Sequence, residues 1–491
     1  MPKSNFKFIC GLLGLIFITA CTGFAAESAE HIFQHALEAD RAGNLDEAID
    51  LFSRAAELDP KNGAILNNRA IIYARKKNYS QALEDLDAAL RLNPEDVAAH
   101  LNRGLIYQEQ SNFEAALDNF NKALEIDREH VPTLLSRAAL RMSTGKPVES
   151  SNDLDRVLQL DPTNVKAQIM AGKLDLARGA PDRALRNFGN ALRLDTKNIE
   201  ALRGRAEAYL VAGDFEKALQ DFTQALSMTN ASADLLSGRC SALVRVGRLE
   251  DAIQDCEEAV NLDPNSSDAL YSLGIARSAA GYDQEAVTAF TSAIDLRSKD
   301  SKYFYNRGAA FNNLGDTEKA WQDFDKAINI DPRNVDALNN RGSIFWARGD
   351  TKKAMADFQE AVSIDQKHLP ALKNLGSIWL VMNLPDKAIP LFDRALKLAP
   401  KDSELLMGLG DAYRAKKQFD KAHSFYRKSL DRAISVAEKY QVLVRTGMAW
   451  EQAGHSPKAV QAYQKALELT QDAAQNEKLT KTIAELGLRR R

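Results

Sequence analysis

The chain has 491 residues, which is more than one compact hydrophobic core normally organises, so several domains or a repeat array are expected. Its 64 lysine and arginine residues nearly balance its 67 aspartate and glutamate residues, and the formal net charge of −3 gives no basic excess typical of a nucleic-acid-binding protein. An apolar fraction of 45% argues against a disordered chain.

The N-terminus has the composition of an export signal. Lys3 and Lys7 precede an apolar run from Phe8 to Ala20. This run is short for a membrane-spanning helix but has the length of the apolar region in a signal peptide. We therefore predict a signal peptide over residues 1–20 and a linker over residues 21–28.

Two processing routes are compatible with this segment. Residues 18–21, Ile-Thr-Ala-Cys, resemble a bacterial lipobox, which implies a lipid on Cys21 and an anchor on the periplasmic side of the cell envelope. Thr22 is not Asp, and by the sorting rule of Gram-negative lipoproteins this implies the outer membrane. Residues 23–25, Gly-Phe-Ala, instead offer small residues to an ordinary signal peptidase, which implies a periplasmic or secreted protein.

A 34-residue pattern fills the rest of the chain. It recurs twelve times without insertion from Ala29 to Val436. Residues 437–439 interrupt the phase, a thirteenth copy spans 440–473, and a tail spans 474–491. The eighth position is small, the twentieth is almost always Ala, the twenty-fourth is mostly Phe, the fifteenth is mostly Gly and the thirty-second is often Pro. We refer to the copies as repeats 1 to 13.

These positions predict two helices in each repeat. The small residues allow close helix packing against the Phe, the Gly suits the left-handed end of the first helix, and the Pro ends the second. The pattern resembles the tetratricopeptide repeat (TPR) family. That resemblance implies an all-α, right-handed solenoid superhelix whose first helices line a concave groove. Leu479, Ile483 and Leu486 lie at helical spacing in the tail and predict a helix that caps the last repeat.

Two positions change together from repeat to repeat. Where the seventh position is Arg, the twenty-third is Asp or, once, Asn, and repeats without the Arg lack the acid. The two positions are about equally far from the turn, so we expect them to face each other as partly buried ion pairs within one repeat. Binding of an acidic ligand by these arginines is the alternative. The expected ion pairs are Arg69–Asp85, Arg137–Asp153, Arg205–Asp221, Arg239–Asp255, Arg307–Asp323 and Arg341–Asp357, and Arg103 faces the neutral Asn119.

Asparagine at the sixth position forms a candidate binding surface. It occurs in two runs, which resemble the asparagine ladder that holds a peptide backbone in the TPR superhelix of the enzyme that transfers N-acetylglucosamine to protein hydroxyls. An amide offers donors and acceptors, so such a row can hold an extended chain. The alternative is that these side chains are simply solvated. The candidate groove residues are Asn68, Asn102, Asn306, Asn340 and Asn374, flanked by Tyr305 and Lys373.

Two cysteines occupy one repeat. Cys240 and Cys256 replace the small residue at position eight and the Phe at position twenty-four, which pack together. After export to an oxidising compartment they could form a disulfide. Two buried thiols that act as small apolar side chains are the alternative.

The sequence contains no constellation typical of an enzyme. His31 and His35 lie four residues apart, but no third metal ligand is near them. We therefore expect no metal, cofactor or catalytic residue. The favoured hypothesis is an exported, lipid-anchored scaffold of the bacterial cell envelope that binds proteins or peptides, not nucleic acid, and meets the membrane only through its anchor. A self-assembling structural solenoid is the alternative, and the oligomeric state is left open.

Overall fold

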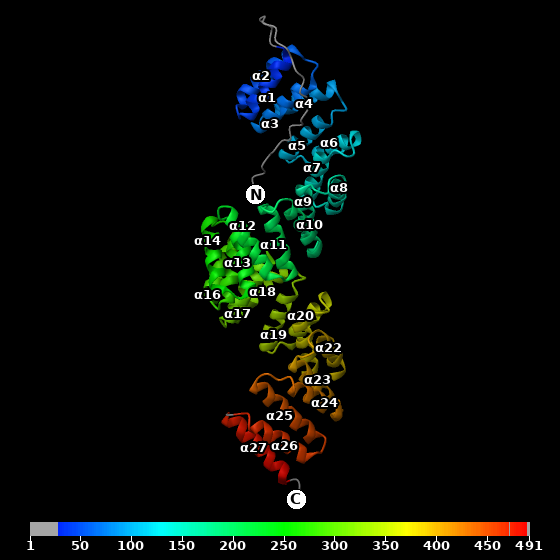
Figure 1. The fold of residues 1–491 in the computed structure, drawn as a ribbon. Coiled ribbons are helices and arrows are strands. Elements are labelled where there is room, and N and C mark those ends of the chain that lie inside the picture. The colour runs from blue at the N-terminus through cyan, green and yellow to red at the C-terminus, as the bar shows by residue number, and fades with distance from the viewer. Residues whose placement is uncertain (1–27, 471, 489–491) are drawn as a thin grey trace. The chain divides into compact units, whose positions relative to one another are not determined.

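The structure is a computed structural model that describes residues 28–470 and 472–488. The predicted signal peptide, both processing sites and Cys21 lie outside these residues. The described residues form helices joined by short connections and contain no strand (Figure 1). The fold is therefore all-α, as the repeat pattern predicted. By its internal contacts the chain divides after Gly213 into an N-terminal part and a C-terminal part, which are described separately.

The N-terminal part contains five helix pairs and one further helix. Its helices are α1 (Ala29–Arg41), α2 (Leu45–Leu58), α3 (Gly63–Arg75), α4 (Tyr79–Leu92), α5 (Val97–Glu109), α6 (Phe113–Ile126), α7 (Val131–Ser143), α8 (Pro147–Leu160), α9 (Val165–Ala177), α10 (Pro181–Leu194) and α11 (Ile199–Ala212).

The C-terminal part begins with the second helix of repeat 6. Its helices are α12 (Phe215–Met228), α13 (Ala233–Val246), α14 (Leu249–Leu262), α15 (Ser267–Ala279), α16 (Asp283–Leu296), α17 (Ser301–Asn313), α18 (Thr317–Ile330), α19 (Val335–Ala347), α20 (Thr351–Ile364), α21 (Leu369–Val381), α22 (Pro385–Leu398), α23 (Ser403–Ala415), α24 (Phe419–Leu430), α25 (Val436–Gln452), α26 (Ser456–Leu467) and α27 (Ala473–Leu488).

Polar residues between the repeats start the first helices. Asn334 caps α19 by accepting a hydrogen bond from the backbone of Ala337, and Asp402 caps α23 in the same way. The second helices end just before the Asp-Pro or similar pair, where Pro cannot continue the helix. The helix boundaries therefore follow from local chemistry in every repeat.

The fifteenth position adopts a left-handed backbone in all thirteen repeats. Nine repeats place Gly there, for example Gly315 with φ of 82°. The other four hold Lys77, Ser111, Asn383 or Lys417, with φ between 56° and 64°. Since a side chain is disfavoured in this region, the turn between the paired helices imposes the conformation even where Gly is missing.

Ser111→Gly is therefore expected to stabilise repeat 3, by about 0.5–1 kcal/mol, because Gly relieves the left-handed strain but adds freedom to the unfolded chain. Thermal unfolding followed by circular dichroism measures this as a higher melting temperature. Glu84→Gly in the exposed interior of α4 is the control, and it should lower stability by about 1 kcal/mol. A loss of stability in Ser111→Gly would contradict the prediction.

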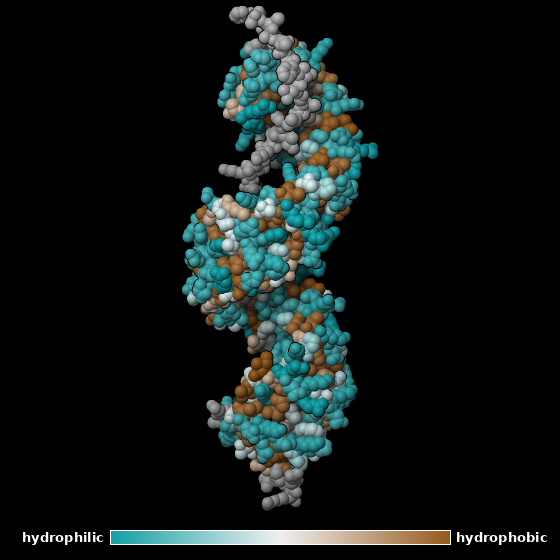
Figure 2. All heavy atoms as spheres, in the orientation of Figure 1, coloured by the Kyte–Doolittle hydropathy of each residue, from teal (hydrophilic) through white to brown (hydrophobic). Residues whose placement is uncertain are grey.

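The close approach of the paired helices explains the Gly and Phe positions. A Cβ placed on Gly308 would lie 2.9 Å from the ring of Phe324, and one on Gly104 would lie 2.6 Å from Phe120. The phenylalanines are almost fully buried and form the centre of each repeat. The apolar core is thus a row of clusters along the repeats, and the one that includes Phe324 extends from Leu270 to Leu409. Hydrophilic and hydrophobic residues are mixed on the surface visible in Figure 2.

The junction before repeat 13 contains a longer helix. Residues 437–439, which interrupt the 34-residue phase, lie inside α25, which begins at Val436 and has 17 residues. The three extra residues therefore lengthen the first helix of repeat 13 by nearly one turn. The tail forms α27, where Leu479 and Leu486 are buried against the last repeat with Ile483 packed beside them.

Candidate functional site

The asparagines at position six link neighbouring repeats. Asn306 donates to the Tyr271 hydroxyl of the preceding repeat at 3.0 Å, and Asn374 donates to Asn339 Oδ1 at 2.9 Å. Asn340 is hydrogen-bonded to the Tyr305 hydroxyl in the same relative position. In each case the sixth position bonds to the fifth position of the repeat before it. Successive first helices on this face are therefore held in register.

The same arrangement occurs once in the N-terminal part. Asn102 is buried and donates to Asn67 Oδ1 at 2.9 Å. Asn68 instead donates to the backbone oxygen of Ala64 in its own helix. The residue at position five before it is the apolar Phe33, which offers no polar partner. Asn102 and Asn68 thus each use an amide donor within the protein itself.

What remains available on these amides is their oxygen. The Nδ2 group of Asn306 donates both to Tyr271 and to the Lys302 backbone oxygen, at 3.0 and 2.8 Å. An amide nitrogen has two hydrogens, so both are used. Asn374 likewise donates to Asn339 and Ser343. The row of half-buried amides in repeats 9 to 11 therefore presents mainly acceptors to a bound chain.

The tyrosines beside this row are held neutral. Burial, followed by the nearby Asp300, raises the pKa of Tyr271 to about 12. Burial also raises the pKa of Tyr305, and Asp336 adds to the effect. Both hydroxyls therefore stay protonated over the physiological range and keep their hydrogen-bonding roles.

The charged groups of this face are already paired. Lys373 forms an ion pair with Glu404 of the next repeat. Asp336 accepts a hydrogen bond from His368 at 3.1 Å, which lowers the pKa of that carboxyl group. The candidate groove therefore offers oxygen acceptors between compensated charges, which suits an uncharged extended backbone.

Packing leaves no room for asparagine in two of the repeats between the two asparagine runs. Repeats 6 and 7 have glycine at position six, Gly204 and Gly238. A Cβ on either would lie 2.4 Å from a Phe ring of the preceding second helix, Phe188 or Phe222. No side chain fits there unless that ring moves.

Five of the arginines at position seven contact two helices besides their own. Arg307 donates to both carboxylate oxygens of Asp323 in its own repeat, at 2.7 and 2.8 Å. Its third contact is the Thr291 hydroxyl, at 3.1 Å, on the second helix of the preceding repeat. Arg341 joins Asp357 and Asp325 in the same way. Each guanidinium is therefore a tie between repeats, which we did not predict.

The other arginines follow this scheme as far as the described contacts extend. The acids are nearly buried, and the hydrogen bond that Arg69 donates to Asp85 raises the pKa of Arg69. Arg205 lies in the N-terminal part and Asp221 in the C-terminal part, so the Arg205–Asp221 ion pair stays a prediction. The remaining contacts are Arg69 with Asp85 and Ser53, Arg103 with Asn119 and Asp87, Arg137 with Asp153 and Asn121, and Arg239 with Asp255.

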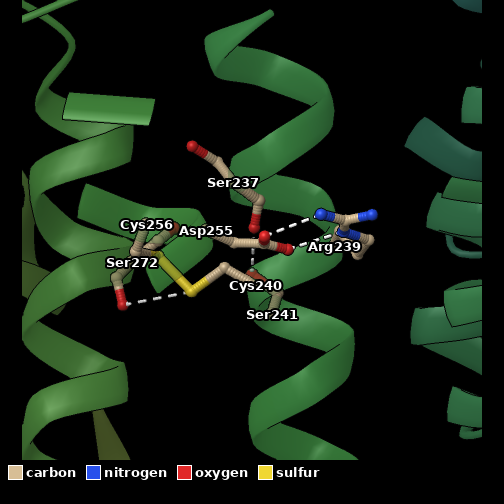
Figure 3. Close-up of a disulfide and its surroundings, with 7 residues drawn as sticks. All are labelled: Ser237, Arg239, Cys240, Ser241, Asp255, Cys256 and Ser272. Atoms are coloured by element: carbon tan, nitrogen blue, oxygen red, sulfur yellow. Dashed lines mark hydrogen bonds and ion pairs between the residues drawn. A yellow bond between two sulfur atoms is a disulfide. The ribbon is translucent and has the colours of Figure 1, made fainter. Parts of the chain in front are cut away.

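Cys240 and Cys256 are joined by a disulfide that connects α13 to α14 (Figure 3). Both residues are fully buried, and their Cα atoms lie 5.7 Å apart. The bond lies beside the Arg239–Asp255 ion pair, so a covalent and an ionic link join the same two helices.

Within residues 28–470 and 472–488 there is no cluster of three or more side chains suited to a metal ion. His31 and His35 lie with their rings 4.3 Å apart. No described helix is both long enough and apolar enough to cross a membrane.

Comparison with known proteins agrees with this architecture. Models described as tetratricopeptide repeat match residues 33–84, 69–133, 175–220, 239–301, 335–368 and 380–437, and one described as TPR repeat matches 310–349. The crystal structure of the APC/C hetero-tetramer Cut9-Hcn1 is similar in fold. It is 17% identical, with 93% of this chain and 96% of that chain covered at a TM-score of 0.56.

Two shorter TPR structures also match. A tetratricopeptide repeat protein from Parabacteroides merdae is 23% identical over 51% of this chain and 99% of its own, with a TM-score of 0.41. YrrB, described as a TPR protein with an unusual peptide-binding site, is 25% identical over 38% of this chain and 95% of its own, with a TM-score of 0.30. From the helix pairs and the family matches along most of its length, the chain belongs to the tetratricopeptide repeat family.

Proposed function

We propose that this protein is an exported scaffold that holds extended segments of other proteins along the first helices of repeats 9 to 11. The TPR family consists of protein–protein interaction scaffolds, which supports the general function. The observation that carries the specific site is the row formed by Asn306, Asn340 and Asn374, which is fixed in register by bonds to the preceding repeats. Its amide oxygens would accept hydrogen bonds from the backbone of a partner. The oxygen of Asn340 already accepts one from Asn339 at 3.3 Å and keeps a second lone pair for this role.

The proposed location is the periplasmic side of a bacterial envelope, with a lipid on Cys21 as the anchor. A buried disulfide between Cys240 and Cys256 supports a compartment in which thiols are oxidised, because such bonds are rare in the cytosol of most organisms. The alternative processing after Ala25 would give a soluble periplasmic or secreted form of the same scaffold.

The groove is tested by chemical crosslinking in envelope extracts with the full chain as bait. We expect the triple variant Asn306→Ala, Asn340→Ala, Asn374→Ala to lose its crosslinked partners by at least tenfold. Asn329→Ala, on the second helix of repeat 9, is the control and should keep them. Circular dichroism establishes that the triple variant is folded. Recovery of the same partners by the folded triple variant would contradict the proposal that these three asparagines bind the partner.

The anchor is tested separately by labelling with radioactive palmitate in a Gram-negative host. The wild type is expected to incorporate label and to sediment with the outer membrane, whereas Cys21→Ser should do neither. An unlabelled, soluble wild-type protein would instead indicate cleavage after Ala25.

A further inference from the structure

A hollow in the C-terminal part is separate from the asparagine row and has a different chemistry. Its volume is about 630 Å³, within the range of ligand pockets, and residues of repeats 11, 12 and 13 line it. Leu380, Val381 and Phe419 give it apolar walls, and Arg414 and Lys417 supply positive charge. Val381 is 73% exposed, which is unusual for an apolar side chain of a first helix.

The positive charge in the hollow exceeds what its own acid compensates. The only acid that lines it, Asp411, accepts hydrogen bonds at 2.8 Å from Tyr426 and from Arg445. Arg414 reaches the same carboxylate only at 3.4 Å. Lys417 is exposed and has no ion pair among the described residues. Two cations, Arg414 and Lys417, therefore line the hollow with one carboxylate, and Arg445 already binds that carboxylate.

Arg414 also has unused hydrogen-bonding capacity. Its Nε atom is buried and has no partner in the described part of the chain, although other groups of the guanidinium contact Tyr426 and Asp411. The Nε atom itself is closed to solvent, so an anion in the hollow would meet the exposed part of the guanidinium instead. The Arg414 guanidinium, the unpaired Lys417 and the apolar walls together favour a carboxylate attached to an apolar neighbour.

We propose that this hollow binds an acidic side chain, Asp or Glu, next to an aliphatic residue in the extended segment held by the scaffold. The proposal rests on the proposed function. Val381 lies seven residues after Asn374 in α21 and hence on the same helix face as the asparagine row. A segment that follows that row would reach the hollow at its end. The asparagine amides would hold the backbone of the partner segment, and the hollow would select segments with an acidic side chain beside an aliphatic one.

The test uses two pools of fluorescein-labelled, nine-residue peptides with blocked termini and randomised flanks. One pool has a central Glu-Leu pair and the other a central Gln-Leu pair. Fluorescence anisotropy with the full chain should show the Glu pool binding at least tenfold more tightly. In Arg414→Met the ratio of the two affinities should fall below three. In Lys417→Gln the ratio should become about three times smaller than in the wild type, and this substitution of an exposed side chain should leave the fold intact.

Arg394→Met, on the second helix of repeat 11, is the matched control and should keep the full preference. Equal binding of the two pools to the wild type, or an unchanged preference in both Arg414→Met and Lys417→Gln, would overturn the proposal. If the two pools bind the wild type equally and the triple asparagine variant binds neither, the asparagine row is supported as a binding site and the preference for an acidic side chain is refuted. If neither pool binds the wild type, both the groove and the hollow are refuted.

Discussion

Asp323→Ala is expected to destabilise repeat 9 by about 3–5 kcal/mol, because it leaves the guanidinium of Arg307 buried without its carboxylate. The two side chains are only 16% and 5% exposed, so water cannot readily replace the lost partner. Hydrogen exchange of the amides in α18, measured by mass spectrometry on the full chain, reports this local loss better than one melting temperature, because repeat proteins can open one repeat at a time.

Two further variants distinguish a buried ion pair from general damage. Asp325→Ala removes a more exposed acid, 39% exposed, and should cost less. The double variant Arg307→Leu, Asp323→Ala should recover most of the stability, because repeat 8 naturally has Leu273 and Ala289 at these positions. Equal protection of α18 in Asp323→Ala and the wild type would show that the pair contributes little.

Loss of the disulfide should have an effect of similar size on repeat 7. The bond closes a loop between residues 16 apart, and a crosslink of this span typically stabilises by roughly 3 kcal/mol through the unfolded chain. Cys240→Ser, or reduction of the wild type, should therefore increase hydrogen exchange in α13 and α14. Titration of the denatured, unreduced protein should find neither Cys240 nor Cys256 as a free thiol.

A substitution that restores the repeat pattern provides the control. Cys240→Gly with Cys256→Phe recreates the pair found in Gly308 and Phe324, so it should regain much of the protection without a crosslink. Its exchange should also be insensitive to reductant. Unchanged exchange in reduced wild-type protein would contradict a stabilising role for the bond.

The fold could be predicted because the sequence repeats it. The Gly, Ala, Phe and Pro positions each correspond to a local geometric requirement, and copies at constant spacing reinforce one another. The pairing of Arg307 with Asp323 was visible for the same reason, since the two positions change together. Helix caps and the left-handed turns also follow from neighbouring residues alone.

Contacts between repeats were harder to predict. The bond from Arg307 to Thr291 involves a position that holds Ser, Asp, Asn or Thr in different repeats, so no single residue type marks it. A search for a polar column sixteen residues before each arginine would have found it. The bond from Asn306 to Tyr271 was missed because it depends on two different side chains in two repeats. The hollow at Arg414 is lined by residues from three repeats. As a set, these residues do not recur at the same positions in other repeats, so a comparison of the repeats could not reveal it.

The arginine ties distribute mechanical strength unevenly along the C-terminal part. Arg307 and Arg341 bind repeats 9 and 10 to the repeats before them, whereas repeats 11 and 12 hold Leu375 and Leu409 at that position and lack the tie. A pulling force on the C-terminal end would therefore first break contacts such as Arg445–Asp411 and Asn374–Asn339, and would meet the arginine ties at residues 301–368 only after that. A partner held at Asn306 and Asn340 would remain attached to this block while the segment around Arg414 gave way.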